Sequence, residues 1–194
     1  MIAGIILAAG ASSRMGTPKA LLDYQGETFL GRLIRVLGSV CDPVIVVLGY
    51  HAGEIRAAVL GSARLVVNPD PSRGQLSSLK TGLAEVPLDA EGFLFMPVDC
   101  PAAEPETIQK IVDAFHSTEQ PLLVIPRHEG RRGHPVCASR ELISEFLALP
   151  PEGQAKEVVR RHADRTLYLD TPDAGVLSDI DDPEAYRILQ ESAR

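Results

Sequence analysis

The chain opens with MIAGIILAAG (residues 1–10), and ASSRMGTPK (residues 11–19) follows directly. The first stretch is almost entirely apolar, yet it is shorter than the roughly 18 residues that a membrane-spanning helix needs. It lacks the basic flank of a secretory signal, and a charged loop follows it at once. We therefore interpret residues 2–7 as a buried strand, and we expect no targeting segment and no membrane contact.

Short apolar runs alternate with amphipathic stretches along the rest of the chain. Because the runs are continuous rather than alternating in polarity, they are typical of strands buried on both faces: Ile2–Leu7, Pro43–Leu48, Leu65–Val67, Gly92–Val98 and Leu122–Ile125. Helices are expected at Thr28–Val40, Gly53–Leu60, Leu76–Glu85, Pro105–Phe115, Glu141–Leu147, Ala155–Arg161 and Pro183–Glu191. This order predicts a three-layer α/β fold, with a mostly parallel, Rossmann-like sheet and helices on both of its faces.

The composition narrows the class of protein. The 194 residues include 19 Lys and Arg against 26 Asp and Glu, a formal net charge of −7, which disfavours general nucleic-acid binding but permits a small anion held by local cations. The three cysteines, Cys41, Cys100 and Cys137, form no CxxC pair. A disulfide framework and a cysteine zinc site are therefore disfavoured, and we expect a cytoplasmic protein. We expect a single domain over residues 1–194, in which residues 129–175 build one wall of a pocket.

The loop after the first strand carries the sharpest functional signal. Ligands of such sheets bind at the carboxyl ends of the strands. Gly10 and Gly16 tolerate positive φ, and successive N–H groups in a loop of this kind form an anion-binding concavity. Hydroxyl donors and the positive charge that a triphosphate demands come from Ser12, Ser13, Arg14 and Lys19. An ordinary solvated loop would explain the glycines and serines alone. Five residues separate the two glycines, so neither a Walker A loop nor GxGxxG fits.

The string LAAGASSRMGTPKALL (residues 7–22) closely resembles the signature LAxGxSxRMGxxK of the MobA-like nucleotidyltransferases. Its AAG form is similar to the molybdenum cofactor cytidylyltransferase branch. Further matching stretches follow in order at residues 74–83, 96–101, 130–136 and 178–184. The resemblance implies a fold of the nucleotide-diphospho-sugar transferase type. It also implies a set of nucleotide-binding residues, namely Leu7, Ala8, Ala9, Gly10, Ser12, Ser13, Arg14, Gly16, Lys19, Gly74, Ser77, Ser78 and Gly82.

Three aspartates are candidates for a metal site. Asp99 follows the apolar run 92–98 at the end of an expected strand, and Mg²⁺ prefers carboxylate and phosphate oxygens. Asp179 and Asp181 stand two residues apart, so both face one side of an extended segment. The alternatives are a turn at Asp99 and helix capping by Asp181 or Asp182. By resemblance, Asp99 is the primary Mg²⁺ ligand and Asp181 the favoured second one.

A basic cluster in this acidic chain suggests a second, anionic substrate. We interpret Arg131, Arg132, His134 and Asp179 as residues that bind the acceptor. The acceptor group that they would bind is an anion such as the phosphate of a pterin. The alternative for the arginines is a solvated hairpin tip, and for His134 a structural position before a strand. Likewise, simple helix capping is the alternative for the serines of residues 77 and 78.

The resemblance implies transfer of a CMP moiety from CTP to a molybdopterin-type molybdenum cofactor, with release of pyrophosphate. Mg²⁺ is the implied cofactor, a molybdoenzyme that receives the product is an implied partner, and the catalytic residues would be Arg14, Lys19 and Asp99. An ionised phosphate nucleophile requires no general base. Three alternatives stay open: GTP in place of CTP, a sugar phosphate or other monophosphate as acceptor, and a non-catalytic chaperone that binds the cofactor. The joint presence of Lys19 and Asp99 favours catalysis over the chaperone.

Overall fold

The computed structural model describes residues 1–59, 61–117 and 120–192. Within these residues the centre is an eight-stranded sheet of order β10-β7-β9-β6-β1-β4-β5, in which β8 pairs with β7. Its strands are β1 (Ile2–Ala8), β4 (Val44–Leu48), β5 (Arg64–Val67), β6 (Gly92–Pro97), β7 (Leu123–His128), β8 (Arg131–Arg132), β9 (Val136–Ser139) and β10 (Thr166–Asp170). A separate two-stranded sheet pairs β2 (Asp23–Tyr24) with β3 (Glu27–Thr28).

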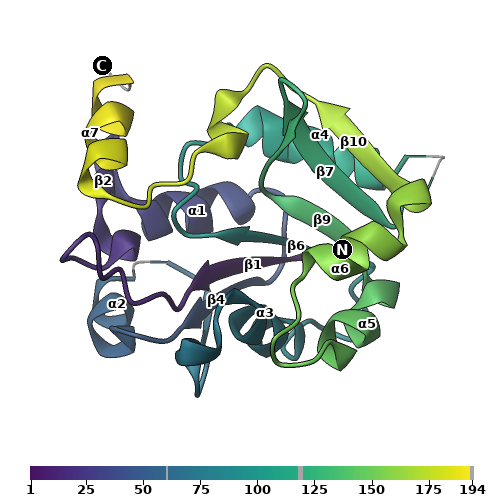
Figure 1. Cartoon of the computed structure of the whole chain (residues 1–194), viewed down its shortest axis with the longest axis horizontal. Coiled ribbons are helices and arrows are strands. Elements are labelled where there is room, and N and C mark those ends of the chain that lie inside the picture. The colour runs from purple at the N-terminus through teal and green to yellow at the C-terminus, as the bar shows by residue number, and fades with distance from the viewer. Residues whose placement is uncertain (60, 118–119, 193–194) are drawn as a thin grey trace.

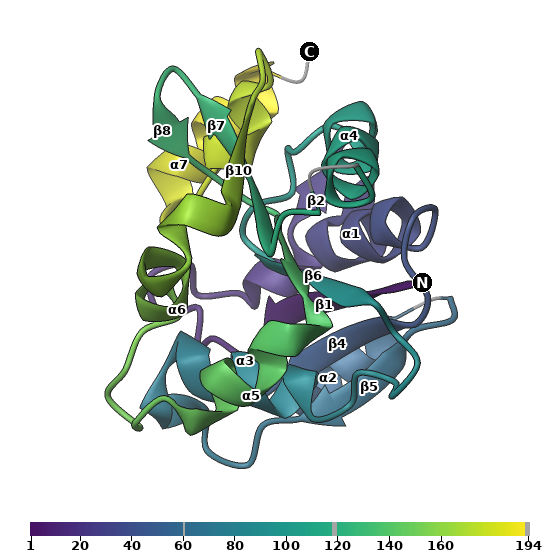
Figure 2. The same cartoon turned by 90° about the vertical axis from the view of Figure 1, so that its right-hand side faces the viewer.

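The helices cover both faces of the sheet (Figures 1 and 2). They are α1 (Phe29–Leu37), α2 (Ala52–Ala58), α3 (Gln75–Leu83), α4 (Pro105–Phe115), α5 (Ile143–Ala148), α6 (Lys156–Arg161) and α7 (Pro183–Ser192). Short 3-10 turns lie at Lys19–Leu21, Pro71–Arg73, Arg140–Leu142, Ala163–Arg165 and Ala174–Leu177. None of the described helices has the length and apolar character needed to span a bilayer.

Alternate residues of β1 enter two different hydrophobic cores. Ile2 and Ile6 pack with buried side chains of α1, α2, α4 and α7, whereas Ile5 and Leu7 pack with those of α3, α5 and α6. This alternation follows from the period of two along a strand. Burial on both faces explains why the strand reads as a continuous apolar run. The three-layer α/β fold class is therefore confirmed.

The order and direction of the strands decide where a ligand can bind. β1 runs parallel to both β4 and β6, and β4 runs parallel to β5. β9 lies antiparallel between β6 and β7, and β10 runs parallel to β7. The carboxyl ends of β1 and β6 therefore meet at one edge of the sheet, where the loops after Ala8 and Pro97 begin.

Two sequence-based expectations need correction. Residues 65–67 are not buried on both faces, because β5 is an edge strand in which Arg64 and Val67 are exposed. The helix expected over 141–147 is divided into a 3-10 turn and α5. The sequence predicted nothing for β10, and for β9 only that a strand follows His134. They lie in the segment 129–175, and they extend the central sheet rather than only forming a pocket wall.

Gly82 of α3 provides a test of the packing between this helix and the sheet. A Cβ atom at Gly82 would lie 2.7 Å from Ile5 Cγ2 and 3.0 Å from Val47 Cγ2. We expect Gly82→Ala to lower the unfolding free energy by about 1–3 kcal/mol through overpacking. Thermal denaturation measures the change. Gly53→Ala in α2 is the matched control, since a Cβ there meets nothing within 4 Å. Equal stability of the two variants would contradict this packing.

Candidate active site

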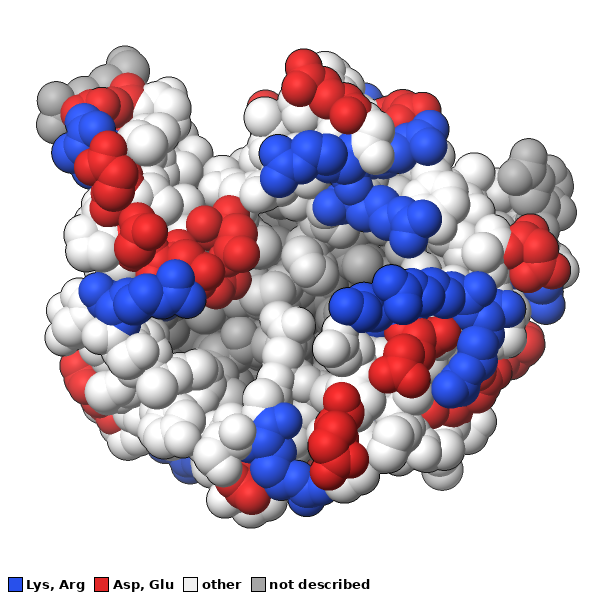
Figure 3. Space-filling view, viewed as in Figure 1, with Lys and Arg blue, Asp and Glu red and all other residues white. Residues whose placement is uncertain are grey.

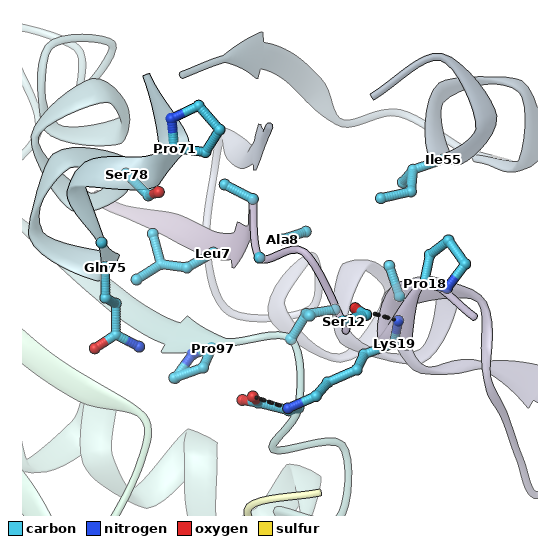
Figure 4. Close-up of a pocket in the computed structure, with 16 residues that line it drawn as sticks. Leu7, Ala8, Ser12, Pro18, Lys19, Ile55, Pro71, Gln75, Ser78 and Pro97 are labelled. Atoms are coloured by element: carbon cyan, nitrogen blue, oxygen red, sulfur yellow. Dashed lines mark hydrogen bonds and ion pairs between the residues drawn. The ribbon is translucent and has the colours of Figure 1, made fainter. Parts of the chain in front are cut away.

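The loop after β1, the residues after β6 and the start of α3 enclose a cavity of about 200 Å³, which we call the first cavity. Figure 4 shows side chains from all three segments turned toward it. The cavity is lined by Leu7, Ala8, Ala9, Gly10, Ser12, Pro18, Lys19, Ala20, Ile55, Pro71, Gly74, Gln75, Ser78, Pro97, Val98 and Asp99. A ligand here would lie at the carboxyl end of the sheet, as expected for this fold.

The first loop turns back on itself and delivers Lys19 to the cavity. Ser12 and Gly16 both have positive φ, 50° and 68°. The backbone N–H of Lys19 donates to Ser12 Oγ at 2.9 Å, a contact visible in Figure 4. This hydrogen bond links the start of the loop at Ser12 to its end at Lys19. As a result the backbone of residues 8–10 and the Lys19 side chain line the same cavity.

The Lys19 ammonium group joins two carboxylates from distant parts of the chain. Its Nζ lies 2.9 Å from Asp99 Oδ2 and 2.6 Å from Asp181 Oδ1. Arg14 Nη2 approaches Asp181 Oδ2 at 3.3 Å. Burial by itself would lower the pKa of Lys19, but attraction by Asp181 and Asp99 outweighs it and raises that pKa. The same ammonium lowers the pKa of Asp181. Both groups are therefore charged at neutral pH.

A third carboxylate completes the cluster. Single oxygen atoms of Asp99, Asp179 and Asp181 lie within 4.8 Å of one another. The segment 179–181 is held beside Asp99 by Ile180, whose N–H donates to the Asp99 carbonyl at 3.0 Å. Partial burial, together with the charges of Asp99 and Asp181, raises the pKa of Asp179. Helix capping falls to Asp182, which accepts the N–H of Ala185 at 2.9 Å.

Two further cavities adjoin the first one. The second cavity, of about 550 Å³, is lined by Leu7, Arg73, Gly74, Gln75, Leu76, Leu79, Phe95, Ile125, Arg132, Gly133, His134, Val136, Pro151, Glu152, Gly153, Gln154, Ala155, Lys156 and Val159. The third cavity, of about 380 Å³, is lined by Gln75, Pro97, Asp99, Cys100, Arg131, Arg132, Gly133, His134, Val176, Leu177, Asp179 and Asp181. Figure 3 shows this face as a hollow with acidic side chains on its left edge and basic side chains above and to the right.

His134 lies between the second and third cavities. Its backbone N–H donates to the Val176 carbonyl at 2.8 Å, and its ring packs edge-on against Phe95. The Nδ1 atom is buried, and no hydrogen-bond partner for it occurs in the part of the chain that the structure describes. Burial lowers the pKa of His134, although the Asp99 charge opposes this shift. The ring is therefore neutral at pH 7.

The lowered pKa of His134 predicts a loss of stability in mild acid. Below the ordinary histidine pKa of about 6.5, the unfolded chain binds a proton that the buried ring does not. The contribution of His134 is therefore present above that pH and is lost as the pH falls. We expect His134→Gln to flatten the decline in unfolding midpoint between pH 7.5 and pH 5. The same exchange at the exposed His116 is the control, and an unchanged decline would contradict the prediction.

The structure brings together most of the predicted site residues, but not all. Lys19, Asp99, Asp179 and Asp181 meet at the cavities, and Arg14 reaches them through Asp181. Ser13 and Gly16 are exposed on the first loop outside the lining of the first cavity. Ser77 and Gly82, two further residues predicted to bind nucleotide, also lie outside that lining. The Ser77 hydroxyl donates to the Gly74 carbonyl at 2.8 Å, and Gly82 packs under the sheet.

Sequence reasoning missed several residues that line the cavities. Gln75 and Arg73 had a signal, because they stand within or beside the matching stretch at residues 74–83. Ile55 and Phe95 had none, since an apolar residue at a regular helix or strand position is typical of the core. Only the three-dimensional arrangement places these side chains against a cavity.

Residues 4–166 match the family model described as MobA-like NTP transferase domain. The chain belongs to this family. Molybdenum cofactor cytidylyltransferase of Escherichia coli (strain K12) is 27% identical over 189 residues, covering 96% of this chain and 94% of that protein. A probable molybdenum cofactor guanylyltransferase of Bacillus cytotoxicus is 30% identical over 167 residues, covering 83% of this chain and 80% of that protein. The resemblance found in the sequence is confirmed.

A solved structure shares the architecture of this MobA-like transferase along its whole length. The crystal structure of Rv0371c from Mycobacterium tuberculosis in complex with manganese is 32% identical, with a TM-score of 0.83 and 98% of both chains covered. The fold type that the sequence resemblance implies is thus confirmed. As a MobA-like NTP transferase, the chain is a nucleotidyltransferase.

Proposed function

We propose that this nucleotidyltransferase moves a CMP moiety from CTP to a molybdopterin-type molybdenum cofactor and releases pyrophosphate. The observation that carries the proposal is the position of Lys19, whose ammonium stands between two carboxylates at the edge of the first cavity. A cation beside a backbone cradle suits a polyphosphate, and carboxylates close to it suit the metal ion that accompanies one. Pure binding of a cofactor would require no such pair.

The nucleotide occupies the first cavity in this proposal. The backbone of Ala8, Ala9 and Gly10 would approach the base and sugar, while the turn from Ser12 to Lys19 would surround the phosphates. Lys19 and Arg14 would stabilise the charge that accumulates on the departing pyrophosphate. In-line attack by a phosphate oxygen of the acceptor forms the new bond at the α-phosphorus, and the bond to pyrophosphate breaks with its electron pair.

The three-carboxylate cluster fits a divalent ion such as Mg²⁺ or Mn²⁺. Its donors are carboxylate oxygens that lie close enough to share one ion, which is the ligand type these cations prefer. Asp99 and Asp181 would hold the ion, and Asp179 stands beside them. When bound, the ion would neutralise phosphate charge during the transfer. Manganese in the related Rv0371c crystal supports the use of a divalent metal.

The acceptor fits the second and third cavities. Their walls carry Arg73, Arg131, Arg132 and Lys156, and the second cavity has an apolar floor that includes Leu76 and Phe95. A compound that combines a flat ring system with a phosphate matches this combination of surfaces. The Arg132 guanidinium also packs over the Tyr168 ring, 4.7 Å from its centroid. This contact fixes the direction from which Arg132 reaches the cavities.

A pyrophosphate-release assay with purified chain, molybdopterin-type cofactor and Mg²⁺ or Mn²⁺ tests the proposal. We expect turnover with CTP and much slower turnover with GTP, in line with the AAG form of the first loop and with the cytidylyltransferase relative. Faster turnover with GTP would assign the chain to the guanylyl reaction named for the Bacillus relative. Turnover with sugar phosphates instead would change the acceptor, and binding without release would point to a chaperone.

A further inference from the structure

The three cavities have one residue in common. Among the described residues, Gln75 alone lines the first, second and third cavities. Arg132 and His134 line the second and third but not the first, whereas Pro97 and Asp99 line the first and third but not the second. A group at Gln75 therefore faces the nucleotide space, the acceptor space and the carboxylate cluster together.

The backbone of Gln75 is firmly held while its amide is free. Gly74, with φ of 82°, turns the chain into α3, and buried Leu76 and Leu79 anchor the helix on the sheet. The Gln75 side chain is exposed, and its amide makes no hydrogen bond within the described part of the chain. In Figure 4 the amide extends from the helix and lies on the side of Pro97 opposite to Lys19. The helix backbone is therefore fixed, and the amide is available to hydrogen-bond a ligand.

The chemistry of an amide suits this meeting point. In the proposed reaction, on which this inference rests, negative charge crosses from the acceptor phosphate to the α-phosphoryl group and then to pyrophosphate. Amide N–H groups donate to phosphoryl oxygens, and the amide carries no charge of its own. A donor that meets these oxygens as they gain charge lowers the barrier more than it strengthens binding.

We propose that Gln75 is a catalytic residue whose amide donates to a nonbridging oxygen of the phosphoryl group under transfer. The acceptor oxygen forms its bond to the α-phosphorus, and the bridging oxygen leaves with its electron pair as part of pyrophosphate. Gln75 keeps its own protons throughout, so atoms and electrons balance. Gln75 therefore stabilises the transferred phosphoryl group in the transition state and adds little to nucleotide affinity.

Single-turnover kinetics of Gln75→Leu test this role. We expect the transfer rate to fall about 100- to 1,000-fold, as for loss of one donor to a developing oxyanion. Nucleotide affinity, measured by equilibrium binding, should stay within about threefold. Gln75→Asn, which keeps a shorter amide, should recover part of the transfer rate at saturating substrate. The matched control is Gln109→Leu, an exposed glutamine on α4, and melting curves establish that each variant is folded.

The two diastereomers of the α-thio nucleotide provide a second readout that a merely structural role would not change. The wild-type chain should use one diastereomer more slowly than the other, and Gln75→Leu should reduce this discrimination. A wild-type transfer rate in Gln75→Leu, or an unchanged diastereomer ratio, would overturn the assignment of Gln75 while the proposed reaction stands. If the wild-type chain transfers nucleotide to no phosphate acceptor, both the proposed function and the role of Gln75 fail.

Discussion

Lys19→Met is expected to lower kcat/KM for nucleotidyl transfer by about three orders of magnitude. Lys19 places its charge at 2.9 Å from Asp99, which lines the first cavity, and at 2.6 Å from Asp181, which lines the third. In the proposed reaction the same charge stabilises the departing pyrophosphate, and methionine keeps the length of the side chain without the charge. A loss of this size corresponds to roughly 4 kcal/mol of transition-state stabilisation, at about 1.4 kcal/mol for each tenfold change.

Two further variants make the result for Lys19→Met interpretable. Lys110→Met on the exposed side of α4 is the matched control and should leave the rate unchanged. Lys19→Arg tests whether charge alone suffices. We expect Lys19→Arg to retain little of the transfer activity, because a planar guanidinium cannot take the place of a compact ammonium between two carboxylates. Activity of Lys19→Met within tenfold of the wild-type chain would contradict the role assigned to this residue.

Asp99→Asn is expected to lower the rate by two to three orders of magnitude, and to weaken the binding of Mn²⁺. The change removes one negative charge from a cluster whose three oxygens lie within 4.8 Å. A neutral amide oxygen is a weaker ligand for a divalent cation than a carboxylate. Electron paramagnetic resonance of Mn²⁺ reports the binding directly and is independent of turnover. Magnesium competition on the same sample gives the relative affinity of the two ions.

The aspartates of the cluster should rank in a definite order. Asp181→Asn should show a substantial but smaller loss than Asp99→Asn, because Asp181 is more exposed than Asp99, with 41% against 21% of the side chain accessible. Asp113→Asn, on the exposed face of α4, is the matched control for loss of a carboxylate. Equal Mn²⁺ binding by the Asp99 and Asp113 variants would show that the metal lies elsewhere.

The parallel half of the fold and its first loop were predictable from sequence. β1, β4 and β6 are buried on both faces, so their residues form continuous apolar runs that need no tertiary information to recognise. The chemical signal of the loop came from residue types at fixed spacing, and Lys19 and Asp99 do meet across 80 positions of sequence. Their meeting follows from one fact of topology, the parallel pairing of β1 with β6.

The rest of the site depended on long-range arrangement. β9 is only Val136–Ser139, with small residues that carry a weak strand signal, yet its antiparallel position between β6 and β7 places Val136 in the wall of the second cavity. β10 is half-buried at an edge and reads as neither a core strand nor a helix. Gly82 matched a family motif, but packing explains why glycine stands there, because a Cβ atom at this position would clash with Ile5. Gln75 lay in a matching stretch without a chemical signal, because its place where three cavities meet depends on the fold.

A crystal structure with a non-hydrolysable CTP analogue and Mn²⁺ is the most direct measurement of the central claim. We expect the triphosphate to lie along residues 10–19 within reach of Lys19. An anomalous manganese peak should appear between the phosphates, Asp99 and Asp181. Nucleotide density away from this loop, or a manganese peak distant from Asp99, would contradict the account.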